Sequence, residues 1–187
     1  MAVTTLDQKT ALIVIDLQKG IVSLPTVHPI AEVVEQAVIL AEAFRDHGLP
    51  VVLVNVDGLP AGRTEQPSRI REFPAGWTDF VAELKQQPQD HTVTKRTADA
   101  FVNTDLEAYL RSKGVTQVVI AGVATSMGVE ATARHARDLG FNVTLALDAM
   151  TDTNPDAHTN SIAHIFPRLG ESGATRDIID LLEKKEA

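Results

Sequence analysis

The 187-residue sequence contains no cysteine. This absence excludes disulfide bonds, thiolate metal ligands and a catalytic thiol. Aromatic residues are scarce, at 4%, and the net charge of −8 is opposite in sign to the charge that phosphate binding needs, so no nucleic-acid partner is expected. No apolar run approaches the roughly 20 residues of a membrane span, and the first residues lack a charged-then-apolar signal pattern. We therefore expect a cytoplasmic protein with no membrane partner.

The composition is that of an ordinary globular protein. Apolar residues make up 44% of the chain and charged residues 22%. A chain of this length buries roughly 70% of the surface that it exposes when unfolded. We expect one domain over residues 1–187.

Short apolar runs alternate with helical patterns along the chain. This alternation is typical of βαβ units and predicts an α/β fold, a three-layer α/β/α sandwich around a mainly parallel, Rossmann-like sheet of about six strands. Four of these runs are strongly apolar: Thr10–Asp16, Val51–Val56, Val115–Gly122 and Phe141–Asp148. A fifth run, His91–Lys95, is more polar and is expected nearer the flank of the sheet.

Capping residues predict where several helices begin and end. A helix over Ala31–His47 should end at Gly48, and a helix over 127–138 should follow the turn at Gly122–Gly128. Residues 57–76 form a long loop, which is typical of a functional segment. Further helix starts are expected at Thr104 with Glu107, at Asn154–Pro155 and at Thr175.

Three features lie at the carboxyl ends of predicted strands, where parallel sheets bind ligands. Asp16 follows the first strand, Lys95 closes the polar strand, and the Gly122–Gly128 turn follows the next. Burial and a neighbouring cation would both act on the pKa of Asp16. The alternative is that Asp16 only caps the turn into Gln18. The position of Asp16 at this edge favours the functional interpretation.

Residues 122–134 read Gly-Val-Ala-Thr-Ser-Met-Gly-Val-Glu-Ala-Thr-Ala-Arg. This segment resembles the signature Gly-Val-Ala-Thr-x-x-Cys-Val-Glu-x-Thr-Ala-Arg of the isochorismatase-like hydrolases, also called cysteine hydrolases. Gly128 stands where that family has its nucleophilic cysteine. The resemblance covers nearly the whole chain, from Thr10 to Asp152 and on through His158 to Arg168.

The resemblance implies roles for the matching residues. Asp16 in Ile-Asp-Leu-Gln and Lys95 in Lys-Arg-x-x-x-Ala-Phe would be catalytic, together with a nucleophile that Gly128 cannot supply. The resemblance also implies a cis peptide bond between Val123 and Ala124, and an oxyanion hole made by the backbone N–H groups of Ala124 and Gly128. Members of the family are commonly homodimers or homotetramers, so the resemblance implies a homo-oligomer.

Glycine at position 128 closes the covalent thioester route. The true isochorismatases resemble this chain in having glycine there, and they hydrolyse a vinyl ether by general acid catalysis. By analogy Asp16 would donate the proton, while Lys95 would position it and bind a small, possibly anionic substrate. The turn Val123-Ala-Thr-Ser126 departs from their Val-Tyr-Ala-His turn, so isochorismate itself is not assigned. The alternative is a catalytically silent member that keeps the pocket for ligand binding or assembly.

Weaker candidates surround these residues. Ser126 and Thr125 are poor substitutes for the thiol, because no histidine is placed to activate them. The six histidines are scattered, so neither a metal nor an organic cofactor is expected, and helix packing or surface roles are assigned to them. Glu130, Thr132 and Arg134 are expected to fix the helix after the turn. Substrate contacts are assigned to Gln18, Phe101, Trp77 and Arg63, with Arg69 and Arg71 as further cations in the long loop.

Overall fold

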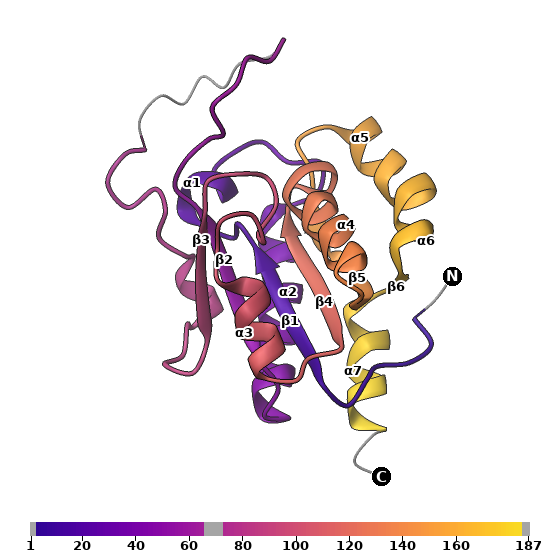
Figure 1. The fold of residues 1–187 in the computed structure, drawn as a ribbon. Helices are drawn as coiled ribbons and strands as arrows, with labels where there is room; N and C mark the ends of the chain where they lie inside the picture. Colours follow the sequence, from indigo (N-terminus) through magenta and orange to yellow (C-terminus); the bar gives the residue numbers. More distant parts are fainter. Residues whose placement is uncertain (1–2, 66–72, 185–187) are drawn as a thin grey trace.

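The computed structural model describes residues 3–65 and 73–184. Six strands form one sheet in which every neighbouring pair is parallel, in the order β3-β2-β1-β4-β5-β6 (Figure 1). This arrangement confirms the expected α/β sandwich, and the polar strand β3 does lie at an edge. The strands are β1 (Thr10–Ile15), β2 (Val51–Val56), β3 (His91–Lys95), β4 (Gln117–Val123), β5 (Asn142–Thr151) and β6 (Glu171–Gly173).

Helices cover both faces of the sheet. Side chains of α2 and α7 pack on one face, and side chains of α3, α4 and α6 pack on the other (Figure 1). Short 3-10 and π-helical turns lie at Ala82–Leu84, Thr125–Val129 and Ser161–Ile165. The α-helices are α1 (Lys19–Val22), α2 (Ile30–Asp46), α3 (Leu106–Ser112), α4 (Glu130–Asp138), α5 (Pro155–Asn160), α6 (Phe166–Leu169) and α7 (Thr175–Glu183).

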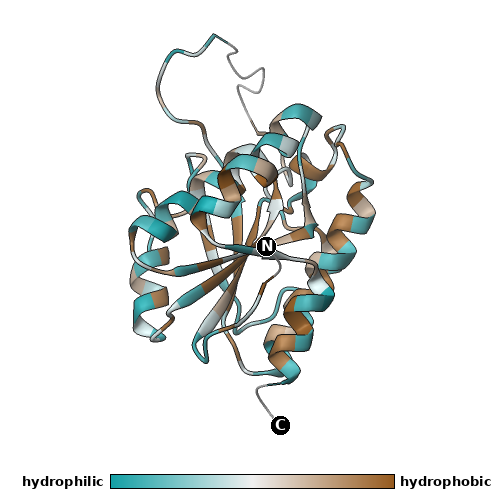
Figure 2. Ribbon diagram, turned by 90° about the vertical axis from the view of Figure 1, so that its right-hand side faces the viewer, coloured by the Kyte–Doolittle hydropathy of each residue, from teal (hydrophilic) through white to brown (hydrophobic). Residues whose placement is uncertain are grey.

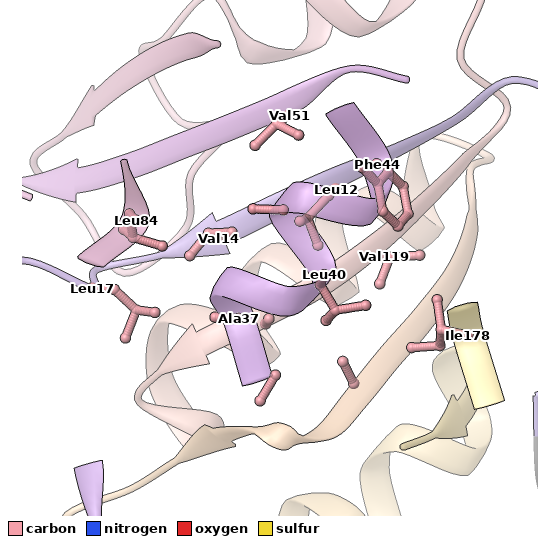
Figure 3. Close-up of a cluster of buried hydrophobic side chains, with 14 of the residues drawn as sticks. Leu12, Val14, Leu17, Ala37, Leu40, Phe44, Val51, Leu84, Val119 and Ile178 are labelled. Atoms are coloured by element: carbon pink, nitrogen blue, oxygen red, sulfur yellow. The ribbon is translucent and has the colours of Figure 1, made fainter. Parts of the chain in front are cut away.

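Strand β1 is buried along its whole length because both of its faces are covered. Successive side chains alternate between the two faces. Leu12 and Val14 pack with Leu40 and Phe44 of α2 (Figure 3), whereas Ile13 belongs to the cluster on the opposite face. An uninterrupted apolar run is what a central strand of such a sheet requires.

The apolar residues follow the layers of the fold. The strands are coloured mostly as hydrophobic, and the helices alternate between hydrophobic and hydrophilic positions (Figure 2). In the part of the chain that the structure describes, no helix is both long and apolar enough to cross a membrane.

The chain turns in opposite directions from β1 and β4, which makes their carboxyl ends the switch point of the sheet. Ile15 of β1 is aligned with Gly122 of β4. Gly122 has a φ of 117°, and a Cβ atom there would lie 2.0 Å from the carbonyl oxygen of Ile15. Glycine at 122 therefore brings the two strand ends into close contact, and Asp16 follows directly.

Two predicted boundaries at this end of the sheet are wrong. Strand β5 was expected to end at Asp148 but continues to Thr151, since a register shift against β4 lets the pairing resume at Met150. Asp148 leaves the ladder and its carboxylate accepts hydrogen bonds from the N–H and hydroxyl of Thr175. The helix expected over 127–138 begins earlier, as a π-helical turn over Thr125–Val129.

The capping predictions succeed at two sites and fail at two. Helix α2 stops just before Gly48, whose φ is 63°, and the Asn154 side chain accepts N–H bonds at the start of α5. Thr104 does not cap α3 in a capping box, because its hydroxyl donates to the Ala100 carbonyl and the N-cap residue is Asp105. Thr175 is the first residue of α7 rather than its cap.

Replacing Gly122 tests whether the close approach of β1 and β4 is needed. Gly122→Ala should lower the free energy of unfolding by more than about 3 kcal/mol, since strain at positive φ adds to a backbone clash. Gly140→Ala is the matched control, because Gly140 also has positive φ but a Cβ there meets nothing within 4 Å. The free energy of unfolding of Gly140→Ala should fall by only about 1–2 kcal/mol. Equal losses in urea unfolding would contradict the steric account.

Candidate functional site

Asp16 and Lys95 come together at the carboxyl end of the sheet. The Lys95 Nζ lies 2.7 Å from Asp16 Oδ2 and donates a second hydrogen bond to the Thr97 carbonyl at 3.1 Å. Both residues are buried, with exposures of 6% for Asp16 and 2% for Lys95. The side chains reach each other from β1 and the edge strand β3, across the end of β2. The structure thus forms the ion pair that the sequence predicts.

The backbone of Asp16 holds its carboxyl in this position. Asp16 adopts a φ of 52°, a left-handed conformation that few residues other than glycine take up. Its N–H donates to the Val54 carbonyl of β2 at 2.8 Å. Unusual backbone conformations of this kind persist where the surrounding structure enforces them, and they are concentrated at functional sites.

Burial dominates the electrostatics of Asp16. Loss of hydration raises the pKa of its carboxyl to about 6, although Lys95 acts in the opposite direction through its charge and its hydrogen bond. The second carboxylate oxygen, Oδ1, is buried and has no hydrogen-bond partner among the described residues. An ionised carboxylate oxygen that is buried without a protein donor is costly, so the protonated form is favoured more than in an exposed aspartate.

The turn after β4 lies against this pair. The Val123–Ala124 peptide bond is cis, as the family resemblance implies. Asp152, which is buried, accepts a hydrogen bond from the Ser126 N–H at 2.8 Å and so anchors the turn to the end of β5. Ala124 lines the same cavity as Asp16. The oxyanion role of the Ala124 and Gly128 N–H groups stays a prediction.

Position 128 is adjacent to the carboxyl of Asp16. A Cβ atom at Gly128 would lie 3.4 Å from Asp16 Oδ2 and 2.8 Å from Ile15 Cγ2. The first distance shows that a side chain here would contact the Asp16–Lys95 pair. The second shows that Ile15 would have to shift to admit it. The site is therefore closely fitted to glycine.

A cavity of about 310 Å³ opens over these residues. Asp16, Lys95 and Gly128 line it, and most of its remaining wall is apolar. This volume is at the lower end of the range for small-molecule sites. The apolar lining includes Ile21, Leu24, Val56, Leu59, Pro60 and Met127.

The four residues expected to contact substrate do not line this cavity. Gln18 is fully buried, and its amide exchanges hydrogen bonds with the backbone of Val56. Phe101 packs in the core against His135 and Phe141. These two side chains are used for packing and for holding neighbouring segments.

Trp77 and Arg63 also lie away from the cavity wall. The Trp77 ring packs so closely on Gly20 that a Cβ there would lie 2.0 Å from it, and the Phe73 ring centroid lies 4.5 Å from that of Trp77. Arg63 is exposed. Arg69 and Arg71, the other predicted cations, lie outside the described residues.

The helix after the turn is fixed as the signature predicts. Glu130 pairs with Arg134 at 2.9 Å and accepts a hydrogen bond from the Ser161 hydroxyl. The Thr132 hydroxyl accepts the Ala100 N–H at 3.1 Å, which ties α4 to the segment after β3. These contacts hold the turn and the Lys95 segment together.

Histidines contribute packing around the same turn. The expectation that no histidine reaches Thr125 is wrong, because the Nδ1 of buried His158 lies 2.9 Å from the Thr125 hydroxyl. Thr125 does not line the Asp16 cavity, however, and the His158 ring contacts the His28 ring edge-on. Burial lowers the pKa of His158. Over residues 3–65 and 73–184, no cluster of three or more His, Cys, Asp or Glu side chains is placed to hold a metal ion.

Residues 10–177 match the isochorismatase domain. The uncharacterized isochorismatase family protein YwoC of Bacillus subtilis is 41% identical over 180 residues, which cover 92% of this chain and 94% of that protein. The chain belongs to the isochorismatase family, whose members include hydrolases. One of these, the streptothricin hydrolase of Streptomyces noursei, is 36% identical over 140 residues, covering 74% of this chain and 48% of that protein.

The solved structures agree with this assignment. An isochorismatase family protein from Burkholderia thailandensis has a TM-score of 0.92 and 38% identity, over 96% of this chain and 98% of that one.

A further relative by sequence is the maleamate amidohydrolase of Pseudomonas putida, which is 27% identical over 94% of this chain and 87% of that protein. The family thus includes amide hydrolysis among its named activities.

Proposed function

We propose that this protein hydrolyses a small molecule by proton transfer from Asp16, without a covalent enzyme intermediate. A vinyl ether is the bond type that suits this chemistry best. The observation that carries the proposal is the buried Asp16–Lys95 pair, with a carboxyl whose pKa is about 6, next to a position that holds no nucleophile. Since the whole chain lacks cysteine, a thioester route has no starting atom.

The reaction begins with Asp16 in its protonated form. The π electrons of the vinyl ether take the proton, a C–H bond forms, and the ether carbon becomes an oxocarbenium ion. Water adds to that carbon and returns a proton to the Asp16 carboxylate. The resulting hemiketal then loses an alcohol, so one water is consumed and one ketone and one alcohol are released.

Lys95 acts while Asp16 is ionised. Its ammonium group stabilises the carboxylate after the proton has left, and its bond to the Thr97 carbonyl keeps it in place. A proton donor works best when its pKa is near the working pH. With a pKa of about 6, roughly a tenth of the Asp16 carboxyl is protonated at pH 7.

A silent member that only binds a ligand is the second candidate. The retained pair favours catalysis, because a binding pocket gains nothing from a buried ion pair whose desolvation is costly. The unusual backbone of Asp16 points the same way, since it holds a titratable group at the cavity. Turnover distinguishes the two candidates.

Replacing the proposed proton donor tests this function. In a screen of vinyl ethers, Asp16→Asn should lower kcat/KM about 10²–10⁴-fold for any substrate that the native protein hydrolyses. Asp180→Asn, which removes a surface carboxylate paired with Arg176, should leave kcat/KM unchanged. The native rate should be constant at low pH and fall tenfold per pH unit above about 6, since only protonated Asp16 donates. Full activity in the Asp16 variant would exclude the mechanism.

Restoring a thiol gives a second test. Gly128→Cys places the only sulfhydryl of the chain beside Asp16 and Lys95. We expect this variant to gain slow amide hydrolysis with an acyl-enzyme detectable by mass spectrometry, at some cost in stability because Ile15 must move. Met127→Cys is the control, since that side chain is 61% exposed, and it should gain none. An acyl-enzyme in the native protein would refute hydrolysis without a covalent intermediate.

A further inference from the structure

Exposed apolar side chains gather at the mouth of the Asp16 cavity. The described part of the chain has five large hydrophobic residues that are exposed. Leu24, Leu59 and Met127 line this cavity, at exposures of 38%, 53% and 61%. Exposed apolar groups that converge on one opening are a sign of a binding site. The two others, Val27 and Ile39, lie outside the cavity lining.

The charges at this cavity are already matched. Among the described residues that line it, Asp16 and Lys95 are the charged ones, and they neutralise each other at 2.7 Å while Asp16 is ionised, as most of it is at and above pH 7. The next cation along the chain, Arg96, pairs with Asp57 at 3.0 Å. Arg63, expected from the sequence to bind an anion, does not line the cavity. In that state the described lining offers an anionic ligand no unpaired cation in exchange for its lost hydration.

We infer that the site takes a neutral, largely apolar small molecule rather than a carboxylate or a dicarboxylate. This inference rests on the proposed function, because it names the class of substrate that Asp16 would protonate. Leu24, Leu59 and Met127 form an apolar rim around the cavity opening. An apolar ligand that covers this rim removes it from water, and each methylene that the ligand buries adds to its affinity. A neutral substrate also keeps the surroundings of Asp16 poorly hydrated, which sustains its raised pKa.

A pair of saturated ethers tests the class of ligand apart from the chemistry. Methyl 2-(cyclohexyloxy)propanoate is neutral, and the corresponding 2-(cyclohexyloxy)propanoate is an anion of the same skeleton. Neither has a vinyl ether to hydrolyse. Calorimetry with the native protein at pH 8, where Asp16 is ionised, therefore reports binding alone, provided that the ester recovered after the titration is intact. We expect the neutral ester to bind at least tenfold more tightly. Equal or tighter binding of the carboxylate would overturn the inference.

Variants at the rim locate the site. Met127→Lys and Leu59→Lys should each weaken binding of the neutral ester at least fivefold. Each should also lower the ratio of the protein's affinity for the ester to its affinity for the carboxylate. Ile39→Lys is the matched control, since Ile39 is an exposed apolar residue outside the cavity, and it should change neither affinity. If the rim variants leave both affinities unchanged and instead alter the mass measured by light scattering, the rim is a contact between copies and the inference fails.

Turnover of the matching vinyl ethers separates this inference from the proposed function. Hydrolysis of the neutral vinyl ether with the expected binding preference supports both. Tight binding of the neutral ester with no hydrolysis in a broad panel of neutral substrates contradicts the proposed function and supports the ligand class. Hydrolysis that is faster for the carboxylate form contradicts the ligand class and leaves the chemistry intact.

Discussion

The buried contact between Asp16 and Lys95 is the interaction on which the site depends. Burial raises the pKa of the carboxyl to about 6, and the ammonium group keeps it from rising further. Without burial, Asp16 would be an ordinary carboxylate, fully ionised and unable to donate a proton at neutral pH. Without Lys95, the ionised form would have no partner in the described part of the chain. The opposing effects place the carboxyl where it can both lose and regain a proton.

The sheet provides this contact through a close approach of its central strands. Gly122 lets β4 lie against the Ile15 carbonyl, and the next residue of β1 is Asp16 in a left-handed conformation. The turn after β4 then brings Gly128 to the carboxyl. In a family that includes amidohydrolases, this chain has the acid and the cation but a glycine at 128, where a side chain would require Ile15 to shift. We propose that its chemistry is proton transfer to a substrate followed by attack of water.

Much of this arrangement could be predicted from the sequence, because it follows from strand order and spacing. Asp16 follows an apolar strand and Lys95 ends a polar one, and the carboxyl ends of parallel strands meet at one edge of the sheet. Side-chain direction in loops could not be predicted. Gln18 turns to the backbone of Val56, and Arg63 stays outside the cavity, while Leu59 and Met127 line it. Such choices depend on tertiary contacts that no local pattern records, as does the register shift that extends β5.

The protonation of Asp16 in the free protein tests the account most directly. Carbon-13 NMR of the Asp16 carboxyl, followed through a pH titration, should give a midpoint near 6 in the native protein. In Lys95→Met the midpoint should move higher, because the cation that stabilises the carboxylate is gone. A native midpoint near the ordinary aspartate value of about 4, or a Lys95→Met midpoint that does not rise, would contradict the claim that burial makes this residue a proton donor.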